Sequence, residues 1–225
     1  MGLSRDNKKM NSILILSGGM DSATLAYHLK VKKHNIHAIT FNYNQRHKKE
    51  IESAKKVAKN LNIQHTILDI SNIGNMLKGS SLTDDIATPH GHYAADNMKL
   101  TVVPNRNAIM LSIVYGIAVS EKSDIVATAV HAGDHFIYPD CRESFIKSLE
   151  STLQLGNDSK IELYTPYINY SKGDIALEGD KLSVLYQDTW TCYEGGDKHC
   201  GKCGACIERK EAFEINNIKD VTEYL

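Results

Sequence analysis

The residues best suited to bind phosphate lie together in the hexapeptide Ser17-Gly18-Gly19-Met20-Asp21-Ser22. An apolar run precedes it at 13–16 and helical spacing of apolar residues follows it at 23–29, so we expect a strand-to-helix turn. Its glycines let the backbone approach a ligand closely, and free N–H groups at the start of the helix favour an anion. Both serines add hydroxyl donors. Asp21 would repel phosphate, so we expect it to hold Mg²⁺ or to orient loop amides.

This loop differs from two common phosphate-binding motifs. It lacks the Lys of a Walker loop and the Gly-x-Gly-x-x-Gly pattern of a dinucleotide fingerprint. It resembles instead the pyrophosphate loop of the ATP pyrophosphatase (PP-loop) superfamily, whose members cleave ATP to AMP and pyrophosphate; a plain glycine-rich turn is the alternative. The resemblance implies that one continuous segment binds ATP, namely Leu16, Ser17, Gly18, Gly19, Met20, Asp21, Ser22, Ala23, Thr24, Leu25 and Ala26.

Four cysteines near the end of the chain have the spacing of metal ligands. Cys192, Cys200, Cys203 and Cys206 form the pattern Cys-x7-Cys-x2-Cys-x2-Cys. Four thiolates can close a tetrahedron around Zn²⁺ with no position left for water, so we expect a structural zinc ion. A [4Fe–4S] cluster is the competing interpretation, because it also takes four cysteines. We expect no disulfide, and we expect His199 to stay outside the metal site.

The composition sets limits on the function. The 225 residues are enough for one α/β domain with a sizeable core. The formal net charge is −1, so nothing predicts electrostatic attraction to nucleic acid. No apolar run approaches the ~20 residues of a membrane span, and the polar stretch 1–11 lacks the apolar core of a signal peptide. We therefore expect a cytoplasmic protein that binds neither membranes nor nucleic acid directly.

Strands and helices are expected to alternate along most of the chain. Apolar patterns predict strands at 13–16, 35–41, 63–70, 125–130 and 161–165. They predict helices after Ser22 and at 48–61, 108–120, 145–156 and 171–182, the last opened by a capping box at Ser171-Lys172-Gly173-Asp174. The alternation predicts an α/β fold, a Rossmann-like (HUP, adenine nucleotide alpha hydrolase-like) parallel sheet with helices on both faces. We divide the chain into an ATP pyrophosphatase-like domain, 1–188, and a zinc-binding segment packed on it, 189–225.

Ligands of such sheets bind at the carboxyl ends of the strands, where several polar side chains are expected to meet. Gln45-Arg46-His47 follows the second strand, and Arg106 stands at the mouth of the helix that begins near 108. Lys172 lies in the first turn of its helix, where a cation is poorly placed for the helix dipole. We expect the cations among these residues to face phosphate or a substrate carboxylate.

A second group of polar residues follows the fourth strand. Asp140 and Arg142 could contact a polar heterocycle, whereas the intervening Cys141 is expected to be a small buried hydrophobe and not a nucleophile. The stretch 77–101 has weak patterning, which is typical of an active-site lid or of disorder.

Five segments together resemble the QueC family of 7-cyano-7-deazaguanine synthases. They are the Ser-Gly-Gly-x-Asp-Ser loop, Tyr-Asn-Gln-Arg-His at 43–47, Val-Pro-Asn-Arg-Asn at 103–107, Tyr-Pro-Asp-Cys-Arg at 138–142, and Thr-Cys-Tyr with Cys-Gly-Lys-Cys-Gly-Ala-Cys at 191–206. Asn105 departs from the Gly that the family usually has there, and Gly204-Ala205 from its more usual Asp-Ser or Pro-Ala. The resemblance covers nearly the whole chain in the same order.

The resemblance implies conversion of 7-carboxy-7-deazaguanine and ammonia to the nitrile preQ0, with ATP and Mg²⁺, in a homodimer. It implies catalytic roles for Asp21, Ser22, Arg46, Arg106 and Lys172. It implies that Gln45, Arg46, His47, Asp140 and Arg142 bind the deazaguanine acid. Two other enzymes stay open: a relative that attaches the activated deazaguanine to another amine, and a tRNA-thiolating enzyme. A zinc-ribbon binding module with a degenerate nucleotide domain is a third alternative, but it predicts a damaged loop.

Overall fold

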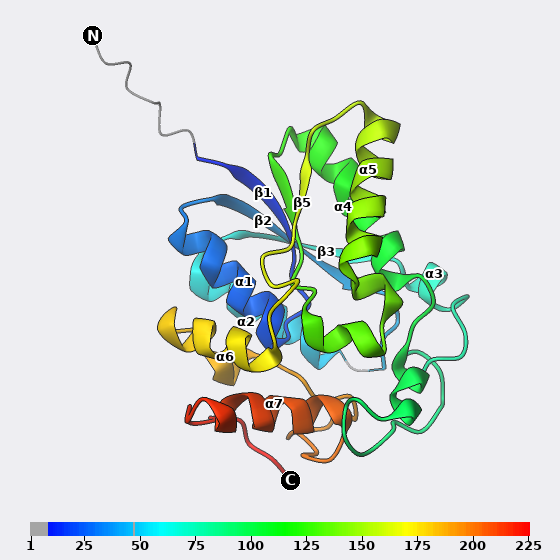
Figure 1. Ribbon diagram of the computed structural model, residues 1–225, viewed down its shortest axis with the longest axis vertical. Helices are drawn as coiled ribbons and strands as arrows, with labels where there is room; N and C mark the ends of the chain where they lie inside the picture. Colours follow the sequence, from blue (N-terminus) through cyan, green and yellow to red (C-terminus); the bar gives the residue numbers. More distant parts are fainter. Residues whose placement is uncertain (1–8, 47) are drawn as a thin grey trace.

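A five-stranded parallel sheet forms the centre of the molecule, in a computed structural model that describes residues 9–46 and 48–225 (Figure 1). The strand order is β3-β2-β1-β4-β5. The strands are β1 (Asn11–Ile15), β2 (Asn35–Asn42), β3 (Gln64–Asp69), β4 (Ile125–Ala127) and β5 (Glu162–Tyr164). Because β1 lies between β2 and β4, the strand order reverses beside β1, and the crevice at this point is where open α/β sheets bind ligands.

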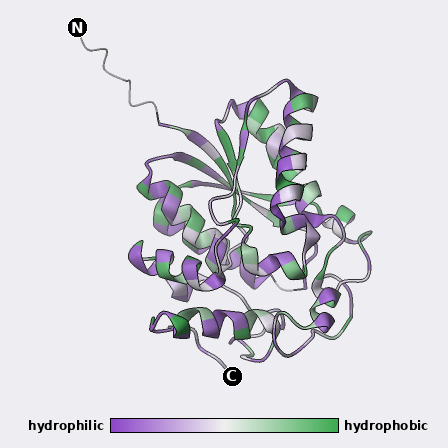
Figure 2. Ribbon diagram, viewed as in Figure 1, coloured by the Kyte–Doolittle hydropathy of each residue, from purple (hydrophilic) through white to green (hydrophobic). Residues whose placement is uncertain are grey.

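Helices cover both faces of the sheet, which confirms the predicted fold class (Figure 1). Leu14 faces a core cluster shared with α1 (Met20–Val31), α2 (Lys49–Leu61) and α6 (Lys172–Lys181). Ile13 faces the other cluster, which it shares with α4 (Arg106–Glu121) and α5 (Glu143–Asn157). Figure 2 shows hydrophobic residues along the strands, as expected for a sheet buried on both faces.

The observed elements agree with the predicted ones to within a few residues, with one instructive difference. The strand expected at 125–130 ends at Ala127, and the next three residues leave the sheet to line a cavity. Asn105 precedes α4 with φ of 56°, in the left-handed region that Gly and Asn tolerate best. This conformation explains how Asn stands where the family usually has Gly. The capping box at Ser171 and Asp174 is confirmed.

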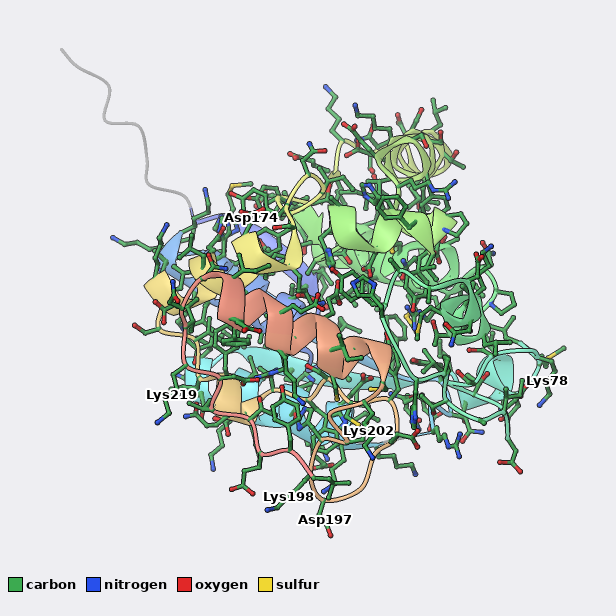
Figure 3. All side chains as sticks on the ribbon, turned by 60° about the horizontal axis from the view of Figure 1, so that its bottom comes forward. Lys78, Asp174, Asp197, Lys198, Lys202 and Lys219 are labelled. Atoms are coloured by element: carbon green, nitrogen blue, oxygen red, sulfur yellow. The ribbon has the colours of Figure 1, made fainter. Side chains whose placement is uncertain are left out.

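The sequence did not predict α7 (Gly204–Ile215), which begins directly after Cys203, contains Cys206 and packs on α6. Figure 3 shows α7 lying across the molecule, with Asp197, Lys198 and Lys202 on the outer edge of the loop before it. The Trp190 N–H donates to the Gly18 carbonyl oxygen at 2.9 Å, so the start of this segment is joined directly to the phosphate loop. The remaining helices are short: α3 (Ser71–Gly74) and the 3₁₀ helices 96–101, 132–136, 139–141 and 186–188.

The stretch 77–101 lies at one side of the molecule (Figure 1) and ends in the 3₁₀ helix at 96–101. It is held at two places by backbone contacts. The Arg46 N–H donates to the Leu82 carbonyl oxygen, and the Gly91 N–H donates to that of Lys202. In the described residues, 9–46 and 48–225, no helix is long and apolar enough to cross a membrane.

Candidate active site

A cavity of about 260 Å³ opens at the carboxyl edge of the sheet. Its wall combines the phosphate loop, the ends of β1 and β2, the starts of α2, α4 and α6, and part of α7. The polar residues in the wall include Ser17, Asp21, Ser22, Gln45, Arg46, Glu50, Arg106, Asp134, Lys172 and Glu208. Residues from five of the predicted motifs thus meet at one place, although several of the predicted residues, Asp140 and Arg142 among them, do not line it.

The phosphate loop has the form expected of a strand-to-helix turn. The Ser17 and Ser22 hydroxyl oxygens lie 3.0 Å apart, and the Ser17 N–H donates to Ser22 Oγ at 3.2 Å. Gly18 has φ of 90°, and a Cβ there would lie 2.1 Å from the Glu50 carbonyl oxygen. Only glycine allows the loop to pass this close to α2.

The segment expected to bind ATP divides into two parts. Leu16, Ser17 and 19–22 line the cavity, whereas Gly18 and 23–26 do not. Ala23, Leu25 and Ala26 belong to the hydrophobic core, and the Thr24 hydroxyl donates to the Met20 carbonyl oxygen. The second part therefore supports α1, and the first part faces the cavity.

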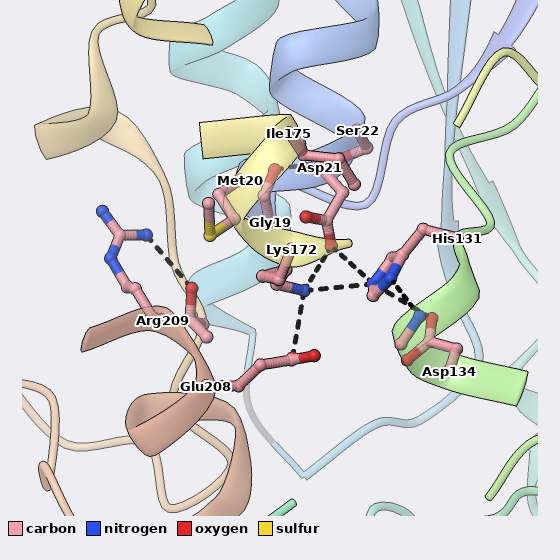
Figure 4. Close-up of polar contacts among 12 residues, drawn as sticks. Gly19, Met20, Asp21, Ser22, His131, Asp134, Lys172, Ile175, Glu208 and Arg209 are labelled. Carbon is pink, nitrogen blue, oxygen red and sulfur yellow. Dashed lines mark hydrogen bonds and ion pairs between the residues drawn. The ribbon is translucent and has the colours of Figure 1, made fainter. Parts of the chain in front are cut away.

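Lys172 lies at the centre of a compact charged cluster beside the loop (Figure 4). Its Nζ lies 2.7 Å from Asp21 Oδ2, 3.2 Å from Glu208 Oε2 and 3.4 Å from His131 Nε2. Burial alone would lower the pKa of Lys172, but the carboxylates of Asp21 and Glu208 outweigh it and raise that pKa. Lys172 is therefore a permanent cation beside the loop. Its position in a first helical turn, which is unfavourable for a lysine, had indicated such a role.

Asp21 has a free oxygen that points to a ligand. Burial tends to raise its pKa, but Lys172 and His131 together outweigh that effect, so the pKa is lowered and Asp21 is ionised. Its Oδ2 contacts Lys172, whereas its Oδ1 is buried and has no hydrogen-bond partner among the described residues. A buried carboxylate oxygen without a partner beside a phosphate loop fits a Mg²⁺ ligand.

Three members of this cluster were missed by the sequence reasoning. His131 Nδ1 accepts the Gly133 N–H, which leaves Nε2 3.4 Å from Asp134 Oδ2 and 3.8 Å from Asp21 Oδ2. His131 and Asp134 lie in the polar stretch after β4 that the sequence marks as a rim, so their position was a usable signal. No signal in the sequence pointed to Glu208, because it reaches the site only through the unpredicted helix α7.

A second set of polar side chains lines the cavity near the start of α4. Arg106, Tyr43 and Glu50 all belong to the wall. Burial raises the pKa of Glu50 to about 7, although the nearby Arg106 guanidinium opposes this effect. Arg106 was expected at the ligand rim. Glu50 was not expected there, because an acidic residue at the start of a solvent-facing helix is common.

The residues expected to bind the deazaguanine acid are placed in different ways. Gln45 lines the cavity, but its amide is used locally: Nε2 donates to the Phe41 carbonyl oxygen and Oε1 accepts the Tyr43 N–H. Arg46 lines the cavity and donates from Nη1 to the Ile86 carbonyl oxygen. His47 lies outside the described residues.

Asp140 and Arg142 are not among the residues that line the cavity. Asp140 Oδ2 accepts the Asn107 N–H at 3.1 Å, and so satisfies a backbone group in the first turn of α4. Arg142 is exposed and donates from Nε to the His135 carbonyl oxygen. Cys141 does line the cavity, but burial raises the pKa of its thiol, which is the wrong direction for a nucleophile.

The four cysteines of the C-terminal segment come together as their spacing predicted. The sulfur atoms of Cys192, Cys200, Cys203 and Cys206 all lie within 4.8 Å of one another. Tetrahedral coordination at a Zn–S distance of about 2.3 Å needs sulfur atoms roughly 3.8 Å apart, so the group could hold a metal ion such as zinc.

Backbone amides around the cluster also suit bound thiolates. The N–H groups of Cys200 and Cys203 donate to sulfur atoms of the group. His199 is not a member, because its Nε2 accepts the Thr191 N–H at 3.1 Å. This hydrogen bond is consistent with the expectation that His199 stays outside the metal site, which remains a prediction.

Comparison with known proteins identifies relatives of this chain. Residues 11–217 match the family described as queuosine biosynthesis protein QueC. The chain is 51% identical over 218 residues to 7-cyano-7-deazaguanine synthase 1 of Mesorhizobium japonicum, covering 96% of this chain and 94% of the relative. It is 50% identical over 217 residues to 7-cyano-7-deazaguanine synthase of Sinorhizobium fredii, covering 96% and 92%. NMN synthetase from Francisella tularensis has a similar fold, with a TM-score of 0.51 at 14% identity over 94% of this chain and 79% of that one.

Proposed function

We propose that this chain, which belongs to the family of queuosine biosynthesis proteins QueC, converts 7-carboxy-7-deazaguanine and ammonia to 7-cyano-7-deazaguanine at the expense of ATP. The main support for this function is that the pyrophosphate loop, Lys172 and Arg106 line one cavity. The chain is also about 50% identical to enzymes named for this product. The alternatives of another amine acceptor or a thiolated tRNA are not favoured, because these relatives are named synthases of the nitrile.

The reaction needs two activations of the same carbon atom. A carboxylate is a poor electrophile, so one of its oxygens first attacks the α-phosphorus of ATP and expels pyrophosphate. Ammonia then adds to the adenylated carbonyl carbon, and AMP leaves with the oxygen, giving the amide. The amide oxygen attacks a second ATP, again expelling pyrophosphate. Loss of AMP and of the nitrogen-bound protons then leaves the nitrile.

The residues of the cavity supply positions and charges for these steps. The loop amides and the hydroxyls of Ser17 and Ser22 would hold the pyrophosphate that leaves. Lys172 and Arg106 would neutralise the charge that develops on the phosphates, and Arg46 would do so at the rim. Asp21, through its unpartnered Oδ1, would hold Mg²⁺, which balances phosphate charge when it is bound. Catalysis is then mainly positioning of the carboxylate in line with the α-phosphorus.

The C-terminal segment has a structural role in this proposal. We assign zinc to Cys192, Cys200, Cys203 and Cys206, one ion per chain, because four thiolates leave no position for water or substrate. Residues 189–225 then form a metal-held segment on the domain 1–188. Free thiols used as ligands require the reducing conditions of the cytoplasm, where we place the enzyme as a homodimer.

Incubation with 7-carboxy-7-deazaguanine, ATP, Mg²⁺ and ammonium, followed by mass analysis, tests the function. We expect the amide and then the nitrile, together with AMP; absence of both products would refute the assignment. Asp21→Ala should abolish AMP formation without loss of zinc, whereas the control Asp180→Ala, at an exposed position of α6, should behave as the wild type. Continued AMP formation by Asp21→Ala would remove Asp21 from the mechanism.

A further inference from the structure

Among the carboxylates that line the cavity, Glu50 differs from the other three. Asp21 and Glu208 both contact Lys172, and the Asp134 carboxylate lies 3.4 Å from His131. For Glu50, no hydrogen bond or ion pair of the side chain is found within residues 9–46 and 48–225. A carboxylate held in a cavity wall without a partner among these residues has two oxygens that can accept hydrogen bonds from a ligand.

The position of Glu50 is fixed by its surroundings. It lies in the first turn of α2, where an acid is favoured by the helix dipole, and this is the plainer reason for its presence. Its own backbone, however, touches Gly18, so the residue cannot shift without moving the phosphate loop. Burial removes water from the Glu50 carboxylate, which disfavours its charged form and raises its pKa to about 7. An acid on the surface would not carry this cost.

The wall around Glu50 suits a flat heterocycle. Phe41 and Met110 contribute buried apolar surface to the cavity, and Arg106 adds guanidinium donors. The pyrimidinone edge of a deazaguanine presents two adjacent donors, the ring N–H and the 2-amino group, next to a carbonyl oxygen. A carboxylate pairs with the two donors. Adenine has a single amino donor on its corresponding edge and no ring N–H there.

We infer that Glu50 binds the ring N–H and 2-amino group of the deazaguanine acid and so selects it over purine-like acids that lack the amino group. The inference rests on the proposed function. Glu50, which lines the cavity, then recognises the heterocycle edge in place of Asp140 and Arg142, which do not.

The test compares two substrates on wild type and variants. Wild-type enzyme should use 7-carboxy-7-deazaguanine with a kcat/KM about 100-fold above that of the analogue without the 2-amino group, because the unpaired carboxylate disfavours the analogue. Glu50→Gln should raise KM for the natural acid at least roughly tenfold, reduce the discrimination to within about threefold, and leave KM for ATP unchanged. The control Glu52→Gln, on an exposed position of the same helix turn, should keep both wild-type values.

Each outcome decides the inference. Equal use of both substrates by the wild-type enzyme would overturn it, and this measurement needs no variant to fold. A changed KM for ATP with unchanged discrimination in Glu50→Gln would also overturn it and would place Glu50 on the nucleotide. Calorimetric titration of the natural acid into both proteins without ATP should show the same loss of affinity. If the wild-type enzyme converts neither acid, the proposed function itself fails; if it converts the acid and Glu50→Gln matches it, only this inference fails.

Discussion

Two groups of charged side chains line the same cavity, and they are organised differently. Lys172 neutralises Asp21 and Glu208 through contacts of 2.7 and 3.2 Å, and His131 Nε2 lies 3.4 Å from its ammonium nitrogen. Glu50 and Arg106 lie in the same wall, but no ion pair joins them. The first group is organised before any ligand binds, as phosphate chemistry requires. The second keeps its hydrogen-bonding capacity for a ligand.

Removing the central cation should give the largest effect. Lys172→Ala leaves Asp21 and Glu208 as neighbouring carboxylates without a cation, and phosphate would meet a negative surface. We expect kcat for AMP formation to fall at least roughly 100-fold, and the free energy of unfolding to fall by about 3 kcal/mol. The control Lys181→Ala, an exposed lysine of the same helix, should leave both unchanged. A fully active Lys172→Ala would show that this group is structural.

Metal removal should separate the two groups. Cys206 lies two residues before Glu208 in α7, so loss of the metal should free Glu208 from Lys172 while Glu50, in α2, keeps its place. We expect Cys203→Ala to lose its zinc and to melt several degrees lower, with a stronger effect on the KM for ATP than on binding of the acid. Elemental analysis and thermal melts measure this. The control Cys141→Ala should keep one zinc per chain; iron in place of zinc, with a brown colour, would contradict the metal assignment.

Gly18→Ala tests the point at which the loop meets α2. Gly18 has φ of 90°, and the added Cβ would lie 2.1 Å from the Glu50 carbonyl oxygen. The phosphate loop and Glu50 should therefore be displaced together. We expect a loss of more than about 1 kcal/mol of stability and weaker binding of both substrates. Gly116→Ala is the matched control, because a Cβ there meets nothing within 4 Å and the site is helical. Equal stability of both variants in denaturant titrations would mean that the contact is loose.

The raised pKa of Glu50 should make the stability of the protein depend on pH. The pKa of Glu50 is raised from 4.5 to about 7 in the folded protein, so the folded state binds this proton more tightly than the unfolded chain does. Glu50 therefore costs no stability below about pH 4.5, and the cost grows through pH 7. Relative to wild type, Glu50→Gln should gain on the order of 2 kcal/mol between pH 5 and pH 8, a figure reduced for partial exposure. Urea titrations at both pH values measure it; a difference independent of pH would contradict a desolvated Glu50.

The sequence was most informative where function depends on contiguous residues. The phosphate loop, the cysteine cluster and the capping box that spans Lys172 are all local patterns, and the structure contains each of them. The alternation of five strands with helices also sufficed for the parallel sheet, because apolar runs and their spacing are local too. The division at residues 188 and 189 stays a prediction.

Residues that meet through long-range packing were harder to predict. Glu208 reaches Lys172 only because α7 packs on α6, and no local pattern announces that contact. Asp140 has the right position, after β4, but its carboxylate accepts a backbone N–H of α4 instead of facing the cavity. Glu50 resembles any acid in a first helical turn, and only the closeness of Gly18 and the cavity wall distinguishes it.

Transfer of the substrate's carboxylate oxygens to AMP tests the central claim, that one cavity adenylates both oxygens of the same carboxyl carbon in turn. The acid would be labelled with ¹⁸O in both carboxylate oxygens and converted with ATP, Mg²⁺ and ammonium, and the AMP, pyrophosphate and nitrile would be weighed by mass spectrometry. We predict two AMP per nitrile, each with one ¹⁸O, and unlabelled pyrophosphate. Unlabelled AMP, or ¹⁸O in pyrophosphate, would contradict attack at the α-phosphorus and with it this account of the site.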